Sequence, residues 1–247
     1  SGVDAVILDI EDAVAPAKKP AARETVVRWL SEGNSAWVRV NDATTPYWAD
    51  DLAALSGLPG LVGVMLAKTE SGGQVEATAA RLADGTPILA LVESAAGLEA
   101  ATEIARADST FRLAFGSGDF RRDTGMSDDP LAMAYPRSRL VVSSRVARLP
   151  GPIDGPTLTA NDSILGRDAA LTLSMGMAGK LCMHTDQVAI VNRELAPSPT
   201  DVSWAHDVID ALGADGAHVK DGSDLPRLAK ALKINELARI FGISAAS

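Results

Sequence analysis

Residues 88–93 read ILALVE, five apolar residues that end in a carboxylate. A strand that is apolar throughout is typical of a sheet buried on both faces, as parallel sheets are. Three further runs have the same form and also end in polar or charged side chains: 3–12 (VDAVILDIED), 37–41 (WVRVN) and 113–119 (LAFGSGD). The carboxyl ends of parallel strands meet at one edge of the sheet, where the sites of such proteins lie. The four runs therefore predict a buried parallel sheet with an acidic site at that edge.

Strand-type runs alternate with helical patterns along the chain, which predicts an α/β fold. The predicted strands are Val3–Ile10, Ala36–Asn41, Leu61–Lys68, Pro87–Glu93, Phe111–Gly116, Pro152–Asp154 and Gly179–His184. The 247 residues fit one (β/α)8 TIM barrel, which has eight strands. We expect such a barrel with its first strand and helix missing from the chain, or a barrel with a gap. It is expected to form a catalytic domain over residues 1–197, followed by a C-terminal helical extension over 198–247.

A doubly wound sheet is the alternative α/β architecture. No Gly-x-Gly-x-x-Gly motif follows the first predicted strand, which weakens a dinucleotide-binding interpretation. No Gly-x-Ser-x-Gly motif is present either, so a serine hydrolase has no support.

Composition narrows the possible partners. The net charge of −9 disfavours binding to nucleic acid or to an anionic membrane. No apolar run approaches the ~20 residues of a membrane span, so no membrane partner is expected. Cys182 is the one cysteine in the sequence, which rules out an intrachain disulfide and fits a reducing compartment. These features favour a cytoplasmic protein.

Four acidic residues stand at the ends of predicted strands. Glu93 and Asp119 follow two successive strands, and with waters and substrate oxygens they would complete the octahedral shell of Mg²⁺. Glu11 and Asp12 end the first strand and could form hydrogen bonds to waters that are bound to the metal. Any one of these acids could instead cap a helix or face solvent. Their common position at strand ends favours the metal site.

Two cationic side chains end the intervening strands. Arg39 lies between two valines and is costly to bury without an anionic partner. That partner is either a substrate carboxylate, bound bidentately, or a structural salt bridge to Glu11 or Asp12. Lys68 could bind an anion or pair with one of the acids, and we favour the ion pair.

The sequence Gly116-Ser117-Gly118 predicts a glycine-rich turn beside the proposed metal. The backbone N–H groups of such a turn could bind a carboxylate or a phosphate. A tight connection between a strand and a helix explains the glycines equally well.

The ordered set of motifs resembles the citrate lyase beta-subunit-like and malyl-CoA lyase family, within the phosphoenolpyruvate/pyruvate-type TIM barrels. The matching motifs are DIEDAV (9–14), KPAAR (19–23), VRVN (38–41), KTES (68–71), VESAAG (92–97), FGSGD (115–119), SR (138–139), IDGP (153–156), GKLCMH (179–184) and PSP (197–199). This resemblance covers nearly the whole chain.

The resemblance implies a Mg²⁺-dependent lyase. Such an enzyme cleaves or forms a carbon–carbon bond in a CoA or acyl-carrier thioester, giving a 2-keto acid and a shorter acyl thioester. Glu93 and Asp119 fall on the family's metal-ligand positions. Glu11 and Asp12 match the acids around the metal waters, and Arg39 matches the arginine near the substrate.

The resemblance also implies a homo-oligomer, a trimer or a hexamer. In the family a C-terminal aspartate reaches a neighbouring subunit's site as acid or base, and Asp224 matches it. The loop 221–226 around it is shorter than the family's pattern. We expect the strand and helix that carry CoA contacts in the family to be missing from the chain.

Other functions remain open from the sequence. One alternative is a thioester hydrolase that uses the same metal site, and another is a non-catalytic subunit that binds an acyl carrier. A metal-dependent aldolase acting on free keto acids is a third. The acyl group, and the choice between CoA and an acyl-carrier protein, are likewise left open.

Overall fold

The structure, a computed structural model, describes residues 2–246. Five strands form a parallel sheet in chain order: β1 (Ile7–Asp9), β2 (Ala36–Val40), β3 (Leu61–Leu66), β4 (Ile88–Val92) and β5 (Thr110–Phe115). Two single parallel bridges continue the series: Ala114 pairs with Ile153, and Asp154 pairs with Lys180. The seven predicted strand positions thus lie in the predicted order, which confirms the parallel α/β fold. Closure into a barrel stays a prediction.

The chain divides into two compact units, one up to Val188 and one from Ala189. The predicted division between 197 and 198 stays a prediction. Helices of the first unit are α1 (Lys19–Ser31), α2 (Tyr47–Leu55), α3 (Gly72–Ala79), α4 (Ala95–Glu99), α5 (Ala101–Arg106), α6 (Ser117–Thr124), α7 (Ala134–Val146) and α8 (Asp162–Ser174), with a 3-10 turn at Pro16–Lys18. Helix α9 (Gln187–Leu195) spans the division, and α10 (Pro199–Leu212) and α11 (Asp224–Phe241) follow it.

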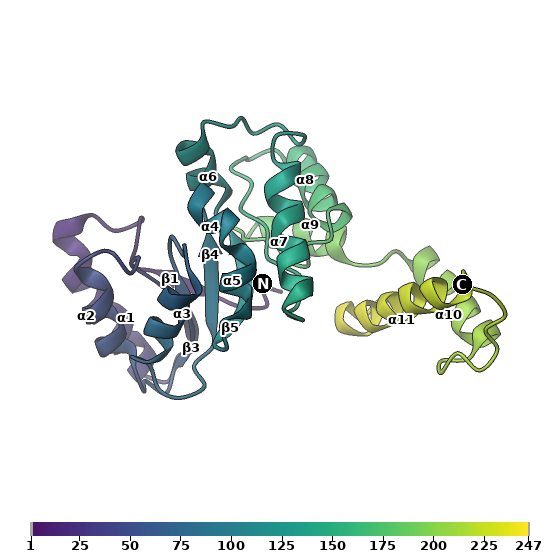
Figure 1. Cartoon of the computed structure of the whole chain (residues 1–247), viewed down its shortest axis with the longest axis horizontal. Helices are drawn as coiled ribbons and strands as arrows, with labels where there is room; N and C mark the ends of the chain where they lie inside the picture. The colour runs from purple at the N-terminus through teal and green to yellow at the C-terminus, as the bar shows by residue number, and fades with distance from the viewer. Residues whose placement is uncertain (1, 247) are drawn as a thin grey trace. The chain divides into compact units, whose positions relative to one another are not determined.

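The sheet is buried on both faces by two separate sets of side chains. Val38 and Val64, which are paired across β2 and β3, belong to the large core beneath the helices that cover one face (Figure 1). Trp37, Met65 and Leu89 belong to a smaller cluster on the other face. Successive residues of a strand point to opposite faces, so burial of both faces requires an apolar residue at nearly every position. This is why the strands read as continuous apolar runs.

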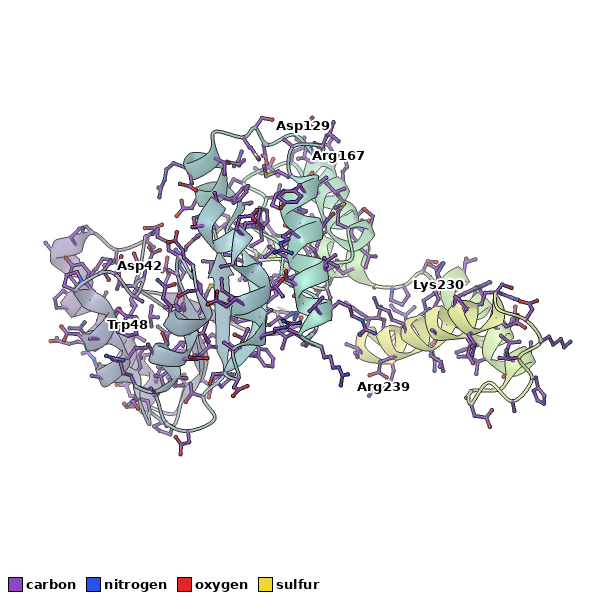
Figure 2. The ribbon with its side chains drawn as sticks, in the orientation of Figure 1. Asp42, Trp48, Asp129, Arg167, Lys230 and Arg239 are labelled. Atoms are coloured by element: carbon purple, nitrogen blue, oxygen red, sulfur yellow. The ribbon has the colours of Figure 1, made fainter. Side chains whose placement is uncertain are left out.

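Helix packing beside the sheet uses polar contacts as well as apolar ones. Trp48 of α2, labelled in Figure 2, is buried, and its indole Nε1 donates to Thr78 Oγ1 of α3 at 3.2 Å. The Arg81 guanidinium lies 4.4 Å from the centre of the same indole. A buried indole N–H needs an acceptor, and this pair fixes α2 against α3.

The second unit is a helical pair with its own core. Helices α10 and α11 pack through Ala205, Val208, Leu212, Leu228 and Ala231. Ser198 is the N-cap residue of α10 and forms a capping box with Asp201. The Ser198 side chain accepts from the N–H of Asp201, and the Asp201 carboxylate accepts from the N–H of Ser198. No helix within residues 2–246 has the length and apolar character needed to cross a membrane.

Of the two interpretations of the glycines after β5, the structure shows the tight connection between a strand and a helix. No longer glycine-rich turn separates the two elements, because α6 begins directly at Ser117 with Gly116 as its N-cap residue. Asp119 therefore lies in the first turn of a helix, where a carboxylate is favoured by the helix dipole.

Candidate active site

The carboxyl edge of the sheet gathers the charged residues that the sequence singled out. Glu11 and Asp12 follow β1, Arg39 lies near the end of β2, Lys68 follows β3, Glu93 follows β4, and Asp119 lies in α6 after β5. All of them belong to the first unit, whose strands are consecutive neighbours.

Glu93 and Asp119 share one cavity. It has a volume of about 410 Å³ and is lined by Lys68, Glu70, Glu93, Ser94, Asp119, Arg122 and Asp123. Glu93 is 4% exposed, and its Oε1 accepts a hydrogen bond from the backbone N–H of Lys68 at 2.8 Å. Burial raises the pKa of Glu93 to about 7, although the hydrogen bond from Lys68 lowers it. The negative charge of Asp119 adds to the rise. Two carboxylates that repel each other in a buried cavity favour a cation between them.

Asp119 has an oxygen that fits such a cation. Its Oδ2 is buried and has no hydrogen-bond partner, and Lys68 Nζ is 3.9 Å away. Buried carboxylate oxygens are nearly always paired, so this atom is suited to a ligand. Among the described residues, no three His, Cys, Asp or Glu side chains form a complete metal cage. Two carboxylates completed by waters and substrate oxygens are the donor set that Mg²⁺ takes.

Gly116 makes room for the Glu93 side chain. A Cβ atom at Gly116 would overlap Oε2 and Cβ of Glu93 and would lie 3.0 Å from Cδ. A Cβ atom at Gly118 would meet nothing within 4 Å. The first glycine is thus required for packing against the acid. The predicted binding of a ligand by Gly116, Ser117 and Gly118 stays a prediction.

Arg39 has a partner that the sequence did not identify. Its Nε donates to Asp9 Oδ1 at 2.9 Å and its NH2 to Asp9 Oδ2 at 2.5 Å, while NH1 lies 3.5 Å from Glu11 Oε2. Although burial works against ionisation of Asp9, Arg39 holds the pKa of that carboxyl below its usual value. The predicted salt bridge to Glu11 exists, and no ion pair with Asp12 is formed. Because Asp9 takes one N–H of Nε and one of NH2, the N–H groups left for a ligand are those of NH1, which also faces Glu11, and the second N–H of NH2.

Lys68 links the acids of different strands, as the favoured ion-pair interpretation predicted. Its Nζ pairs with Glu11 Oε1 and lies 3.5 Å from Asp12 Oδ1. The φ angle of Lys68 is +46°, in the left-handed region. Its backbone N–H donates to Glu93, while its side chain pairs with Glu11. Burial raises the pKa of Glu11 despite Lys68. Burial also opposes ionisation of Asp12, but the neighbouring Glu11 and the charge of Lys68 lower the pKa of Asp12.

Asp224 belongs to the second unit and is buried there. Its Oδ2 accepts from the N–H of Lys220 at 3.0 Å, and its Oδ1 lies 3.3 Å from Arg227 NH1. These contacts fix the start of α11. The catalytic role expected for Asp224 stays a prediction.

Sequence reasoning missed one group that shapes the site, Asp9. The sequence signal was its place two residues before Glu11, a spacing that puts side chains on the same face of an extended chain. Ser94, directly after Glu93, caps α4, accepting from the Gly97 N–H at 3.1 Å and donating to Glu70 Oε1 at 2.5 Å.

Fold and site together define a class: α/β proteins with a carboxylate-lined cavity at the carboxyl edge of a parallel sheet. The family model described as HpcH/HpaI aldolase/citrate lyase matches residues 1–185, and the model of the HpcH/HpaI aldolase C-terminal domain matches 200–242. The chain belongs to the HpcH/HpaI aldolase/citrate lyase family. This confirms the predicted resemblance and, with it, the enzyme class, a lyase.

Curated relatives carry lyase names. A citrate lyase subunit beta-like protein of Deinococcus radiodurans is 33% identical, with 94% of this chain and 88% of the relative covered. The human mitochondrial citramalyl-CoA lyase is 30% identical over 96% of this chain and 79% of its own length.

Solved structures give the same result. CitE from Mycobacterium tuberculosis in complex with magnesium, acetoacetate and coenzyme A matches with a TM-score of 0.77 and 29% identity, over 95% of this chain and 90% of that one. The citrate lyase beta subunit of the same organism, complexed with oxaloacetate and magnesium, matches with a TM-score of 0.69 and 31% identity, over 79% and 88%.

Proposed function

We propose that the protein is a Mg²⁺-dependent carbon–carbon lyase that acts on hydroxyacyl-CoA thioesters. It would cleave them to a 2-keto acid and a shorter acyl thioester, or catalyse the reverse condensation. The observation that carries this proposal is the pair Glu93 and Asp119 in one cavity, with Asp119 Oδ2 buried and without a hydrogen-bond partner. Magnesium and coenzyme A in solved relatives, and oxaloacetate in another, support it.

Glu93 and Asp119 would hold the metal, which supplies Lewis-acid polarisation of a substrate oxygen when bound. Burial keeps water away from Glu93 and strengthens its interaction with any cation. Lys68 and Arg39 fix Glu11 beside the cavity from two sides. Glu11 and Asp12 would then orient waters at the metal.

In the cleavage direction the substrate hydroxyl loses its proton and the carbon–carbon bond breaks. The electron pair of that bond passes to the thioester as an enolate, and protonation of the enolate gives the shorter thioester. Arg39 NH1 would hold the thioester oxygen while Asp9 keeps the guanidinium in place. Loss of one such contact to developing charge costs about 3–4 kcal/mol of barrier.

The proposal includes an assembly and a location. We expect the parallel strands to belong to a (β/α)8 barrel, supported by the strand order and by the cluster of apolar side chains on the face away from the helices. Chains would assemble as trimers or hexamers, with residues 198–247 contacting a neighbouring subunit and Asp224 acting there as acid or base. The single cysteine supports a cytoplasmic location.

The proposal is tested by incubating the protein with Mg²⁺ and a panel of hydroxyacyl-CoAs, including malyl, citramalyl and citryl thioesters. Mass spectrometry should detect a keto acid and a shorter thioester. Free thiol with an intact hydroxy acid would instead identify a thioester hydrolase, and no turnover of any thioester would favour a non-catalytic acyl-carrier-binding subunit. Cleavage of free hydroxy acids that free CoA does not inhibit would identify an aldolase.

The metal assignment is tested by Glu93→Gln. We expect loss of Mg²⁺-dependent turnover with the fold retained, because the neutral amide is a poor ligand for a hard cation. Glu76→Gln, the same substitution at an exposed position of α3, should behave as the wild type. Normal Mg²⁺ affinity and rate in Glu93→Gln would show that the ligand assignment is wrong.

A further inference from the structure

Lys19 belongs to the KPAAR motif, which has no role in the proposed chemistry. Its side chain is 7% exposed although it carries an ammonium group. Nζ donates to the carbonyl oxygens of Glu11 at 2.9 Å and Ile10 at 3.3 Å, and to Asn41 Oδ1 at 2.6 Å. These three acceptors are neutral oxygens, and two of them belong to the backbone at the end of β1. The buried charge is therefore directed at the segment that carries Glu11.

The position of Lys19 is fixed by a network that reaches α1 and α2. Asn41 Nδ2 donates to Ile10 O at 3.2 Å and to Asp51 Oδ2 at 2.6 Å. Arg23 NH1, one helical turn after Lys19, donates to Asp51 Oδ1 at 2.9 Å. Asp51 is 1% exposed and Asn41 is 2% exposed. A buried polar network in which these groups are all paired holds one arrangement rigidly.

Burial of an ammonium group costs several kcal/mol unless its hydrogen bonds are satisfied. The apolar core alone would be better served by leucine or methionine at this position. Lys19 instead fixes the orientation of two consecutive carbonyl groups, those of Ile10 and Glu11. The Glu11 side chain leaves the same stretch of backbone, so its direction is fixed as well. That side chain must lie between Lys68 Nζ and Arg39 NH1.

We infer that Lys19 is a positioning residue for the acidic site: its clamp on the Ile10 and Glu11 carbonyls sets the direction of the Glu11 carboxylate beside the Mg²⁺ cavity. The inference rests on the proposed function for the identity of the metal. Asn41 and Asp51 act with Lys19, because they hold the same end of β1 from the side of β2 and α2.

The test compares two matched variants, Lys19→Met and Arg112→Met. Arg112 is also a partly buried cation that clamps two backbone carbonyls, Gly151 O at 2.5 Å and Ala178 O at 2.8 Å. Those carbonyls precede the strand positions at 153–154 and 180, at the amino edge of the sheet, opposite the site. Urea unfolding measures the stability of each variant, and calorimetric titration of the substrate-free protein with MgCl₂ measures metal affinity.

We expect both variants to be less stable than the wild type. Only Lys19→Met should bind Mg²⁺ more weakly, by about tenfold or more, as is typical when a group that orients a metal's surroundings is removed. Lys19→Gln, which keeps two donors without the charge, should bind with intermediate affinity. If Lys19→Met does not fold, Lys19→Gln carries the comparison with Arg112→Met.

Equal Mg²⁺ affinity in the Lys19 and Arg112 variants would overturn the inference, and so would a wild-type protein that binds no Mg²⁺. The thioester assay is separate from this titration. A wild-type protein that binds Mg²⁺ but cleaves no thioester would overturn the proposed function, while the comparison of affinities would still decide the role of Lys19.

Discussion

At the scale of the residue, the site depends on contacts that only one side chain can make. Gly116 is the example beside the cavity that Glu93 and Asp119 line, since any Cβ there would overlap Glu93. Arg39 is the example beside the acids, since Asp9 accepts from both Nε and NH2 of its guanidinium and so fixes its orientation. Each of these contacts can be removed by a substitution that we expect to change Mg²⁺ binding or turnover while the fold is retained.

Gly116→Ala should weaken Mg²⁺ binding, because the new methyl group must displace the carboxylate of Glu93. We expect at least a tenfold loss of affinity in a calorimetric titration, by analogy with other changes that misorient a ligand. Gly73→Ala is the control: it lies in α3, and its Cβ would meet only Ser71 Oγ at 3.9 Å. Unchanged affinity in Gly116→Ala would show that Glu93 does not bind the metal in the observed rotamer.

Asp9→Asn should lower kcat although Arg39 itself is unchanged. The amide cannot accept two hydrogen bonds from the fork, so the guanidinium is free to turn away from the substrate oxygen. Small displacements of this kind cost roughly tenfold to hundredfold in rate. Asp50→Asn, at an exposed partner of Arg23, should have no effect on steady-state kinetics. A wild-type kcat in Asp9→Asn would mean that Arg39 needs no fixed orientation.

At the scale of the element, the apolar runs predicted the sheet well, because a strand that is buried on both faces needs an apolar residue at nearly every position. The helix α6 was missed because Gly116, Ser117 and Gly118 resemble a turn, and no local signal showed that Gly116 serves packing. Asp9 was missed as a partner of Arg39 because a pairing across two strands, 30 residues apart, depends on register. The acids themselves were found, because a strand end is a position that the sequence defines.

The two single bridges after β5 are supported by a buried ionic cluster around Asp154. Asp154 is fully buried, and it pairs with Arg137 Nε at 3.0 Å and Lys180 Nζ at 3.4 Å and accepts from Thr172 Oγ1 at 2.6 Å. The carboxylate thus joins α7, α8 and the last two strand positions. Removal of one member of a buried ionic cluster leaves uncompensated charge and costs about 3–5 kcal/mol.

Asp154→Asn should therefore lower the free energy of unfolding, with a defined pH dependence. Burial alone would raise the pKa of Asp154, but Lys180, Arg137 and Thr172 hold it below its ordinary value of 3.8. A carboxyl with a lowered folded pKa stabilises fully above its unfolded pKa and loses that contribution as pH falls through the folded pKa. Urea unfolding should show a constant advantage of wild type over variant from pH 7 to 5 and a smaller one below pH 4. An advantage that persists undiminished at pH 3 would contradict the assignment.

At the scale of the whole molecule, the residues proposed for catalysis belong to two separate units. Glu93 and Asp119 belong to the first unit, and Asp224 belongs to the second, where its own backbone contacts hold it. In a symmetric oligomer a residue of one subunit can complete the site of the next. A shared site of this kind can be detected without knowing how the units are arranged.

Subunits that carry Glu93→Gln and subunits that carry Asp224→Asn should each be inactive alone and should regain activity when they assemble together. Random mixing in a closed ring leaves about a quarter of the sites with an intact Glu93 from one subunit and an intact Asp224 from the other, and about a third in trimers that contain both kinds of subunit. The measurement is the keto acid released by co-expressed, differently tagged chains purified through both tags, with light scattering to confirm that each variant assembles. No recovery in mixed assemblies would place both residues in sites of a single chain, and an active Asp224→Asn on its own would remove Asp224 from the chemistry.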